Sequence, residues 1–223
     1  MKAMILAAGR GERLRPLTDT TPKPLLRVGG KPLMQYTLEA LVRAGFDELV
    51  INHAHLGDQI EQYFGDGAAF GAQIHWSREP SGALDTGGGI AQALPKLGEH
   101  FVVVNGDLWT DYPFARLREV SPSLAHLVLV DNPPQHPNGD FVLTGQRVTA
   151  QGAPCLTFSG IGVYHRDLFS ACTSGKFPLA PLLRAVMARD EVRGEYYHGA
   201  WQDIGTPEQL AELNRRISGQ PVG

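Results

Sequence analysis

The chain has 223 residues, which is enough for one α/β domain with a sizeable core. A hydrophobic fraction of 43% and a charged fraction of 19% are ordinary for a globular protein, and the net charge of −3 gives no sign of a nucleic-acid partner. No segment approaches the roughly 18 apolar residues of a membrane span. Cys155 and Cys172 lack metal-ligand spacing, so we expect reduced thiols in a soluble, cytoplasmic protein.

Helical and extended patterns alternate along residues 1–110. This alternation favours an α/β fold with a Rossmann-like, mixed but mostly parallel sheet and helices on both faces. The expected strands cover 2–8, 48–52, 72–77 and 101–105, and the expected helices cover 32–44, 56–64 and 88–94.

Beyond residue 110 the pattern changes to shorter extended segments and turns, with no linker between the halves. We predict a single domain over 1–223, in which 1–110 forms one half of the sheet and 111–223 adds a β-rich substrate lobe. A hairpin is expected around Thr144-Gly145-Gln146, and Thr206 is the expected N-cap of the closing helix. The expected strands cover 125–130, 141–143, 147–149, 157–164, 193–197 and 200–203, and the helices cover 179–188 and 207–217.

A glycine-rich turn follows the first apolar strand directly, in the stretch 4–24 (MILAAGRGERLRPLTDTTPKP). Gly9 and Gly11 permit a sharp turn that aims backbone N–H groups at an anion. Arg13 can fork onto phosphate oxygens, and Lys23 adds a mobile positive charge. The pattern is neither a Walker A loop nor a dinucleotide fingerprint, so a tight structural turn is the alternative to a triphosphate site.

Two aspartates follow extended segments that we expect to end near this loop. Asp107 comes directly after the apolar strand 101–105, and Asp203 ends the segment 200–203. Ligands of open α/β sheets bind beyond the carboxyl ends of the strands, and paired carboxylates suit a magnesium ion that bridges substrate phosphates. The alternative for each is a turn-forming carboxylate.

A second glycine-rich stretch, 84–90 (LDTGGGI), precedes a helix. Three consecutive glycines are unfavourable in backbone entropy, which fits a place where a flat ligand such as a nucleobase presses on the main chain. A loose turn before the helix is the alternative. His53 and His55 would share one face of a strand, as a metal pair or, more ordinarily, as two satisfied strand-end histidines.

Together these stretches resemble the signature of the sugar-1-phosphate nucleotidyltransferases. The resemblance rests on LAAGRGERLRPLT, PKPLLRVGGKPLMQYTLEAL, EPSGALDTGGGI, VNGD and WQDIGTPEQL, and covers nearly the whole chain. It implies a nucleotide-binding half at 1–110 and a sugar-binding half at 111–223. The implied roles are triphosphate binding by Ala8, Gly9, Gly11, Glu12, Arg13 and Lys23, base contact by Thr86, Gly87 and Gly88, sugar contact by Asn105, Asp140, Ser159 and Gly160, and Mg²⁺ binding by Asp107 and Asp203.

The resemblance also implies the reaction. A sugar-phosphate oxygen attacks the α-phosphorus of a nucleoside triphosphate in line, with Arg13 and Lys23 as the catalytic cations and pyrophosphate as the leaving group. We expect UTP and N-acetylmuramate 1-phosphate, in the recycling of cell-wall sugars. Mannose 1-phosphate with GTP, glucose 1-phosphate with UTP or dTTP, and a binding module without turnover remain alternatives.

The chain departs from the family pattern in three places. The lysine that holds the sugar phosphate in many members has no counterpart between Lys96 and Lys176, where Arg147 or a backbone amide would have to replace it. Asp85 stands at a position where glycine is common in the family. Asp140, the expected sugar contact, has a turn-forming aspartate in Asn-Gly-Asp as its alternative interpretation. The helical extension of longer members is missing, which favours a monomer over a tetramer.

Overall fold

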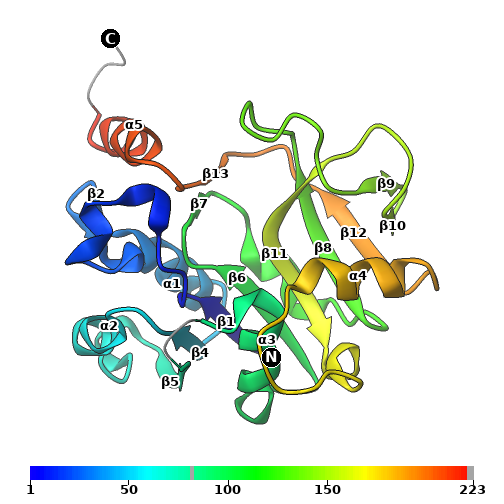
Figure 1. Ribbon diagram of the computed structural model, residues 1–223, viewed down its shortest axis with the longest axis horizontal. Helices are drawn as coiled ribbons and strands as arrows, with labels where there is room; N and C mark the ends of the chain where they lie inside the picture. Colours follow the sequence, from blue (N-terminus) through cyan, green and yellow to red (C-terminus); the bar gives the residue numbers. More distant parts are fainter. Residues whose placement is uncertain (81–82, 220–223) are drawn as a thin grey trace.

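The computed structural model describes residues 1–80 and 83–219, and its centre is a single sheet of nine strands (Figure 1). In chain order these strands are β1 (Lys2–Leu6), β4 (Glu48–His53), β5 (Gln73–Arg78), β6 (His100–Asn105), β8 (Ala125–Val130), β9 (Val142–Thr144), β10 (Arg147–Thr149), β11 (Thr157–His165) and β12 (Val192–Tyr196). Their spatial order is β5-β4-β1-β6-β11-β8-β12-β10-β9.

The pairing pattern confirms the predicted mixed, mostly parallel sheet. β5, β4, β1 and β6 are parallel neighbours, and β12 is parallel to β8. Only β11 and β10 run against the common direction of the other strands. The antiparallel pairing of β11 with β6 joins the two halves of the chain into one sheet.

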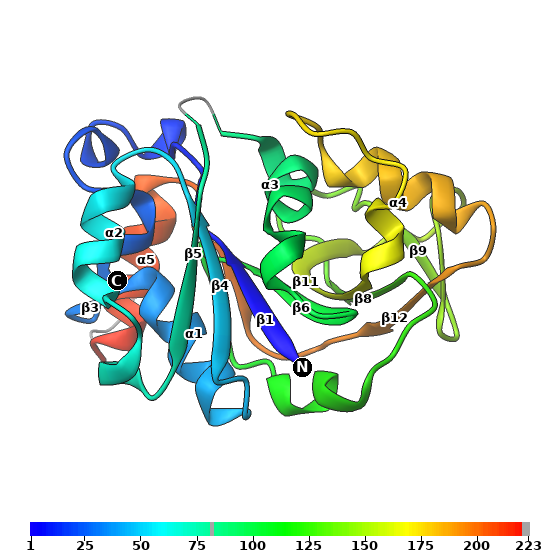
Figure 2. The same ribbon diagram turned by 90° about the horizontal axis from the view of Figure 1, so that it is seen from below.

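Helices cover both faces of the sheet, as predicted. They are α1 (Leu33–Arg43), α2 (Gly57–Phe64), α3 (Asp85–Ala93), α4 (Leu179–Met187) and α5 (Pro207–Ile217). Figure 2 shows α1 and α2 on one side of β1 and β4, with α3 and α4 on the other side. No helix among the described residues has the length and apolar character needed to cross a membrane.

The first strand explains why the sheet is covered on both faces. Ala3 and Ile5 belong to the buried cluster that includes residues of α1 and α2, whereas Met4 between them belongs to the cluster of α3 and α4. Successive side chains of a strand point to opposite faces, so a continuous apolar run requires a partner on each side. This packing fixes the carboxyl end of β1, where the glycine-rich loop begins.

Two small sheets complete the fold. β7 (Leu108–Thr110) pairs with β13 (Trp201–Asp203), and β2 (Arg27–Val28) pairs with β3 (Lys31–Pro32). The last helix packs on the β2–β3 hairpin, where the Asn214 side chain accepts a hydrogen bond of 2.8 Å from the Gly29 N–H. The closing segment is therefore attached to the region that contains the opening loop.

Most predicted elements are confirmed, with boundaries within one or two residues. Thr206 is the N-cap of α5 and forms a capping box with Gln209, and β9 and β10 form the predicted hairpin. The helix predicted at 88–94 begins instead at Asp85, so its first turns contain the glycines. Neither β7 nor the short 3₁₀ turns of the opening loop were expected from the sequence. Cys155 and Cys172 are free thiols, as expected.

Candidate active site

A continuous groove lies beyond the carboxyl ends of β1, β4 and β6. Its central cavity, of about 230 Å³, is lined by residues that include Gly9, Glu79, Thr86, Asn105 and Asp107. A loop cavity of about 90 Å³ shares Gly9 and Asp107 with it, and a β11 cavity of about 220 Å³ shares Thr86 and Asn105. The candidate groove thus lies where the strand-end rule predicts a ligand site.

Hydrogen bonds from side chains within the opening loop fix its backbone beside the loop cavity. Gly11 has φ of 71°, a left-handed conformation that glycine adopts most easily, and its carbonyl accepts a hydrogen bond of 2.9 Å from the Thr18 hydroxyl. Arg10 braces the loop by donating to the Thr18 carbonyl and to Asp19. A Cβ atom added at Gly9 would meet no atom within 4 Å, so this position faces open space.

The charged residues of the loop divide into structural and free groups. Glu12 and Asp19 form ion pairs with Arg10 and Arg15. Arg13 has no ion pair within the described residues. Its guanidinium lies against Gly205, where an added Cβ would come within 2.7 Å of Nη2. Arg13 is thus the loop cation that remains available, close to the end of β13.

The centre of the groove contains an ion pair between Lys23 and Asp107. Lys23 Nζ lies 2.5 Å from Asp107 Oδ2, with side-chain exposures of 12% and 33%. Asp107 and Asp203 come together through the small sheet of β7 and β13, in which Asp203 faces Leu108 and the Ile204 N–H donates to the Asp107 carbonyl. Asp107, which pairs with Lys23, and Asp203 are thus neighbours through their backbones, and the Asp203 carboxylate accepts a hydrogen bond of 3.3 Å from Gln135.

A buried polar network holds the floor of the central cavity, and the sequence reasoning missed it. The Ala7 N–H donates to Asn52 Oδ1 over 2.8 Å, and Asn52 Nδ2 donates to Glu79 Oε1 over 2.6 Å. Glu79 Oε2 accepts the Leu84 N–H over 2.7 Å. Asn52 and Glu79 lie at the carboxyl ends of β4 and β5, so the strand-end rule that selected Asp107 would also have found them.

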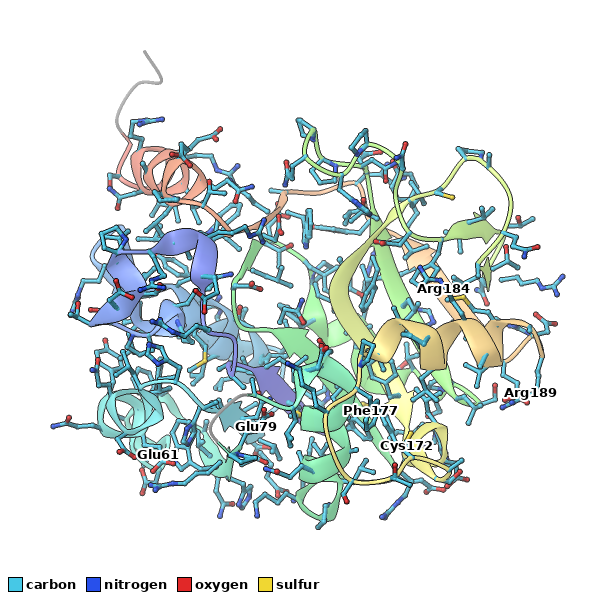
Figure 3. All side chains as sticks on the ribbon, in the orientation of Figure 1. Glu61, Glu79, Cys172, Phe177, Arg184 and Arg189 are labelled. Carbon is cyan, nitrogen blue, oxygen red and sulfur yellow. The ribbon has the colours of Figure 1, made fainter. Side chains whose placement is uncertain are left out.

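The glycines of α3 are packed against protein. A Cβ at Gly87 would meet the Phe177 ring at 2.5 Å, one at Gly88 would meet the Gly175 carbonyl at 2.2 Å, and one at Gly89 would meet Glu79 at 2.5 Å. Glu79 and Phe177 lie on opposite sides of the start of α3 (Figure 3). The close packing of α3 against these neighbours therefore explains the three glycines without a ligand. Base contact by Gly87 and Gly88 stays a prediction.

Residues in front of these glycines reach the groove. Thr86 lines both the central and the β11 cavities, and Ala83 and Asp85 line the central one. Ser81 and Gly82, within the stretch that resembles the family's base-contacting loop, lie outside the described residues.

The four predicted sugar-side residues take different positions. Asn105 and Asp140 line the β11 cavity. Asp140 accepts the Phe158 N–H over 2.8 Å and contacts the His136 ring over 3.1 Å, so it also orders its own turn. The Ser159 hydroxyl donates to the Val128 carbonyl, and its side chain is turned into the sheet instead of the groove. Gly160 has φ of 78° and lies against Asn105, where a Cβ would come within 2.5 Å of Nδ2.

The two histidines at the end of β4 are structural. His53 is buried and its Nε2 contacts Glu61 over 2.6 Å, whereas His55 Nε2 contacts the Thr18 carbonyl over 3.0 Å. The ordinary interpretation of this pair is therefore correct, and within the described residues no group of three or more His, Cys, Asp and Glu side chains could hold a metal.

Comparisons with known proteins show which family the chain belongs to. The profile of the family described as nucleotidyl transferase matches residues 2–142. The chain is 53% identical over 222 residues to an N-acetylmuramate alpha-1-phosphate uridylyltransferase of Neisseria meningitidis, with 95% of this chain and 96% of the relative covered. A protein of the same name from Caulobacter vibrioides is 31% identical, with 97% and 96% covered.

Among solved structures, a putative glucose-1-phosphate thymidylyltransferase from Bacillus anthracis superposes with a TM-score of 0.85. It is 22% identical in sequence, and the match covers 100% of this chain and 97% of that one, which establishes the shared fold. The chain therefore belongs to the nucleotidyl transferase family, within its sugar-1-phosphate nucleotidyltransferases.

Proposed function

We propose that this enzyme transfers the uridylyl group of UTP to N-acetylmuramate 1-phosphate, giving UDP-N-acetylmuramate and pyrophosphate in the recycling of cell-wall sugars. The similarity to the uridylyltransferase of Neisseria meningitidis, over nearly the full length of both chains, supports this choice of substrates. The single structural observation that carries the reaction type is the Lys23–Asp107 pair, at a point bordered by the loop cavity and the central cavity.

The groove suggests a place for each substrate. The triphosphate would lie on the loop cavity, where Gly9 and Gly11 present the main chain, and Arg13, which lies against Gly205, would steady the departing pyrophosphate. The uridine would extend along the central cavity past Thr86. The sugar would occupy the β11 cavity beside Asn105 and Asp140, with its phosphate directed toward Asp107.

The chemistry needs positioning and charge neutralisation. An oxygen of the sugar phosphate attacks the α-phosphorus of UTP, and the bond from that phosphorus to the pyrophosphate oxygen breaks on the opposite side. The sugar phosphate is an anionic nucleophile, so no protein base has to remove a proton. Lys23 moves from Asp107 to the α-phosphate as charge develops there, and Arg13 neutralises the leaving group.

The donor set fits a magnesium ion. Asp107 and Asp203 are brought together by the pairing of β7 with β13, and Mg²⁺ is commonly held by one or two carboxylates together with substrate phosphates. When bound, the ion would neutralise phosphate charge and polarise the α-phosphate. Lys23 Nζ lies within hydrogen-bond distance of one oxygen of Asp107, so a metal ion bound to that oxygen would compete with this ion pair.

A substrate panel tests the proposal. The purified protein is incubated with Mg²⁺ and each of the four nucleoside triphosphates, paired with the 1-phosphates of N-acetylmuramate, mannose and glucose, and pyrophosphate is measured. We expect the highest kcat/KM for UTP with N-acetylmuramate 1-phosphate. If another pair is turned over more efficiently, the proposed substrates are wrong, and if no pair is turned over, so is the proposed activity.

A further inference from the structure

An arginine of α4 lies at the edge of the β11 cavity and has no part in the site described above. Ala180 and Leu183 line this cavity, and Arg184 lies four residues after Ala180, on the same face of α4 as Ala180. Its guanidinium carbon lies 5.7 Å from the centre of the Phe141 ring. Because Phe141 also lines the cavity, the guanidinium is held over one of its walls.

Arg184 differs from the other arginines in this part of the chain. Arg147 and Arg193 both pair with Asp190, and Arg189 pairs with Glu191. Within the described residues Arg184 forms no ion pair, and its side chain is exposed. Figure 3 shows it on α4 itself, whereas Arg189 lies beyond the end of the helix. Its charge is therefore free to meet a ligand.

The residues that line the β11 cavity include no positive side chain; they are Thr86, Asn105, Asp140, Phe141, Phe158, Pro178, Leu179, Ala180 and Leu183. Its one carboxylate, Asp140, is already engaged by the Phe158 N–H and by His136. A neutral sugar would need no cation at this edge. An acidic substituent would need one, because a carboxylate that leaves water without a partner is strongly disfavoured.

We propose that Arg184 binds the carboxylate of an acidic sugar 1-phosphate, which in the proposed reaction is the lactyl carboxylate of N-acetylmuramate. This assignment rests on the proposed function. A guanidinium matches a carboxylate with two parallel N–H donors, and the Phe141 ring beneath it restricts its orientation before the sugar arrives. Arg184 is thus a specificity residue and takes no part in the transfer itself.

The experiment compares two variants on two sugars. Arg184→Gln removes the charge, and Arg189→Gln is the matched control, since it removes an arginine nearby in the sequence that is already paired with Glu191. Each variant and the wild type receive UTP with N-acetylmuramate 1-phosphate or with N-acetylglucosamine 1-phosphate, which lacks the lactyl group. Where turnover of the second sugar is too slow, its dissociation constant is measured by calorimetry instead.

We expect Arg184→Gln to lower kcat/KM for the acidic sugar about tenfold, the range of one charge-assisted hydrogen bond at an exposed edge. The values for N-acetylglucosamine 1-phosphate should stay within about twofold, Arg189→Gln should change neither, and Arg184→Lys should restore part of the loss. An equal loss on both sugars, or no loss on either, would overturn the assignment. A wild type inactive on N-acetylmuramate 1-phosphate contradicts the proposed function instead, and the dissociation constants of the two sugars then still test Arg184.

Discussion

The ion pair between Lys23 and Asp107 joins two residues that are 84 positions apart in the sequence. Lys23 is 12% exposed, so its ammonium group has little access to water and depends on Asp107 for charge compensation. A substrate phosphate entering the loop cavity offers the lysine a second anionic partner. Binding of the substrate phosphate to Lys23 would therefore weaken the contact between Lys23 and Asp107.

Asp107→Asn tests this residue most directly. The substitution keeps the size of the side chain, removes the charge that neutralises Lys23, and would weaken the proposed metal binding. We expect kcat to fall about 100-fold or more, since a divalent ion on a transferring phosphate contributes several kcal/mol. The measurement is pyrophosphate release over a range of Mg²⁺ concentrations, together with thermal unfolding to verify that the fold is intact.

Asp167→Asn is the matched control. Asp167 is exposed and follows β11, whose last residue pairs with the first residue of β6, so it lies at the opposite edge of the sheet. Turnover of this variant should equal that of the wild type. Normal turnover in Asp107→Asn, with an unchanged dependence on Mg²⁺, would exclude Asp107 as a metal ligand.

At the scale of elements, the longer strands and helices could be predicted because burial leaves a periodic pattern in the sequence. Val102 and Val104 pack on one face of the sheet, and Val103 packs on the other, so β6 is an unbroken apolar run. The pairing of β7 with β13 could not be predicted, because two three-residue segments about 90 positions apart meet only in the folded chain. That pairing brings Asp107 beside Asp203.

Individual site residues show the same limit. Asp107 and Lys23 follow recognisable motifs, and both line the loop cavity. The Ser159 hydroxyl is directed by its hydrogen bond to the Val128 carbonyl, and the Arg184 guanidinium is directed by its contact with the Phe141 ring. Both are tertiary contacts. No local pattern in the sequence encodes those contacts, so the sugar side of the groove was the harder half to predict.

The Glu61 side chain connects three elements, namely α2, β4 and β5. From α2 it accepts hydrogen bonds from Arg78 at the end of β5, over 2.8 and 2.5 Å, and it contacts His53 at the end of β4 (labelled Glu61 in Figure 3). Arg78 holds the pKa of Glu61 below its ordinary value of 4.5, and His53 adds to this effect, although burial acts in the opposite direction. The carboxylate form is therefore the one that stabilises the fold.

This predicts a stability loss that depends on pH. A depressed pKa contributes stability above the unfolded value near 4.5, and this contribution is lost as the pH falls through the folded pKa. Glu61→Gln should lower the free energy of unfolding by about 1 kcal/mol at roughly pH 7 and by much less at about pH 3.5. Urea denaturation at both pH values measures this change in the free energy of unfolding, and Glu212→Gln, at an exposed position, is the control. A loss of equal size at both pH values would contradict the role of the charge.

At the scale of the whole molecule, one continuous sheet carries both proposed substrate regions. The first half of the chain supplies β5, β4, β1 and β6 and most of the central and loop cavities, and the second half supplies much of the β11 cavity. The closing segment returns to the first half, where α5 contacts the β2–β3 hairpin and Gly205 receives the Arg13 side chain. The assignment of nucleotide to one half and sugar to the other stays a prediction.

This architecture makes a direct claim about the reaction, namely that both substrates occupy one groove and react with each other. The protein is incubated with UTP and Mg²⁺, with and without N-acetylmuramate 1-phosphate, and pyrophosphate, UDP-sugar and uridylylated protein are quantified. Our account predicts equal amounts of pyrophosphate and UDP-sugar when the sugar is present, and neither pyrophosphate nor labelled protein without it. Pyrophosphate release without the sugar, accompanied by a uridylyl group attached to the protein, would contradict the account.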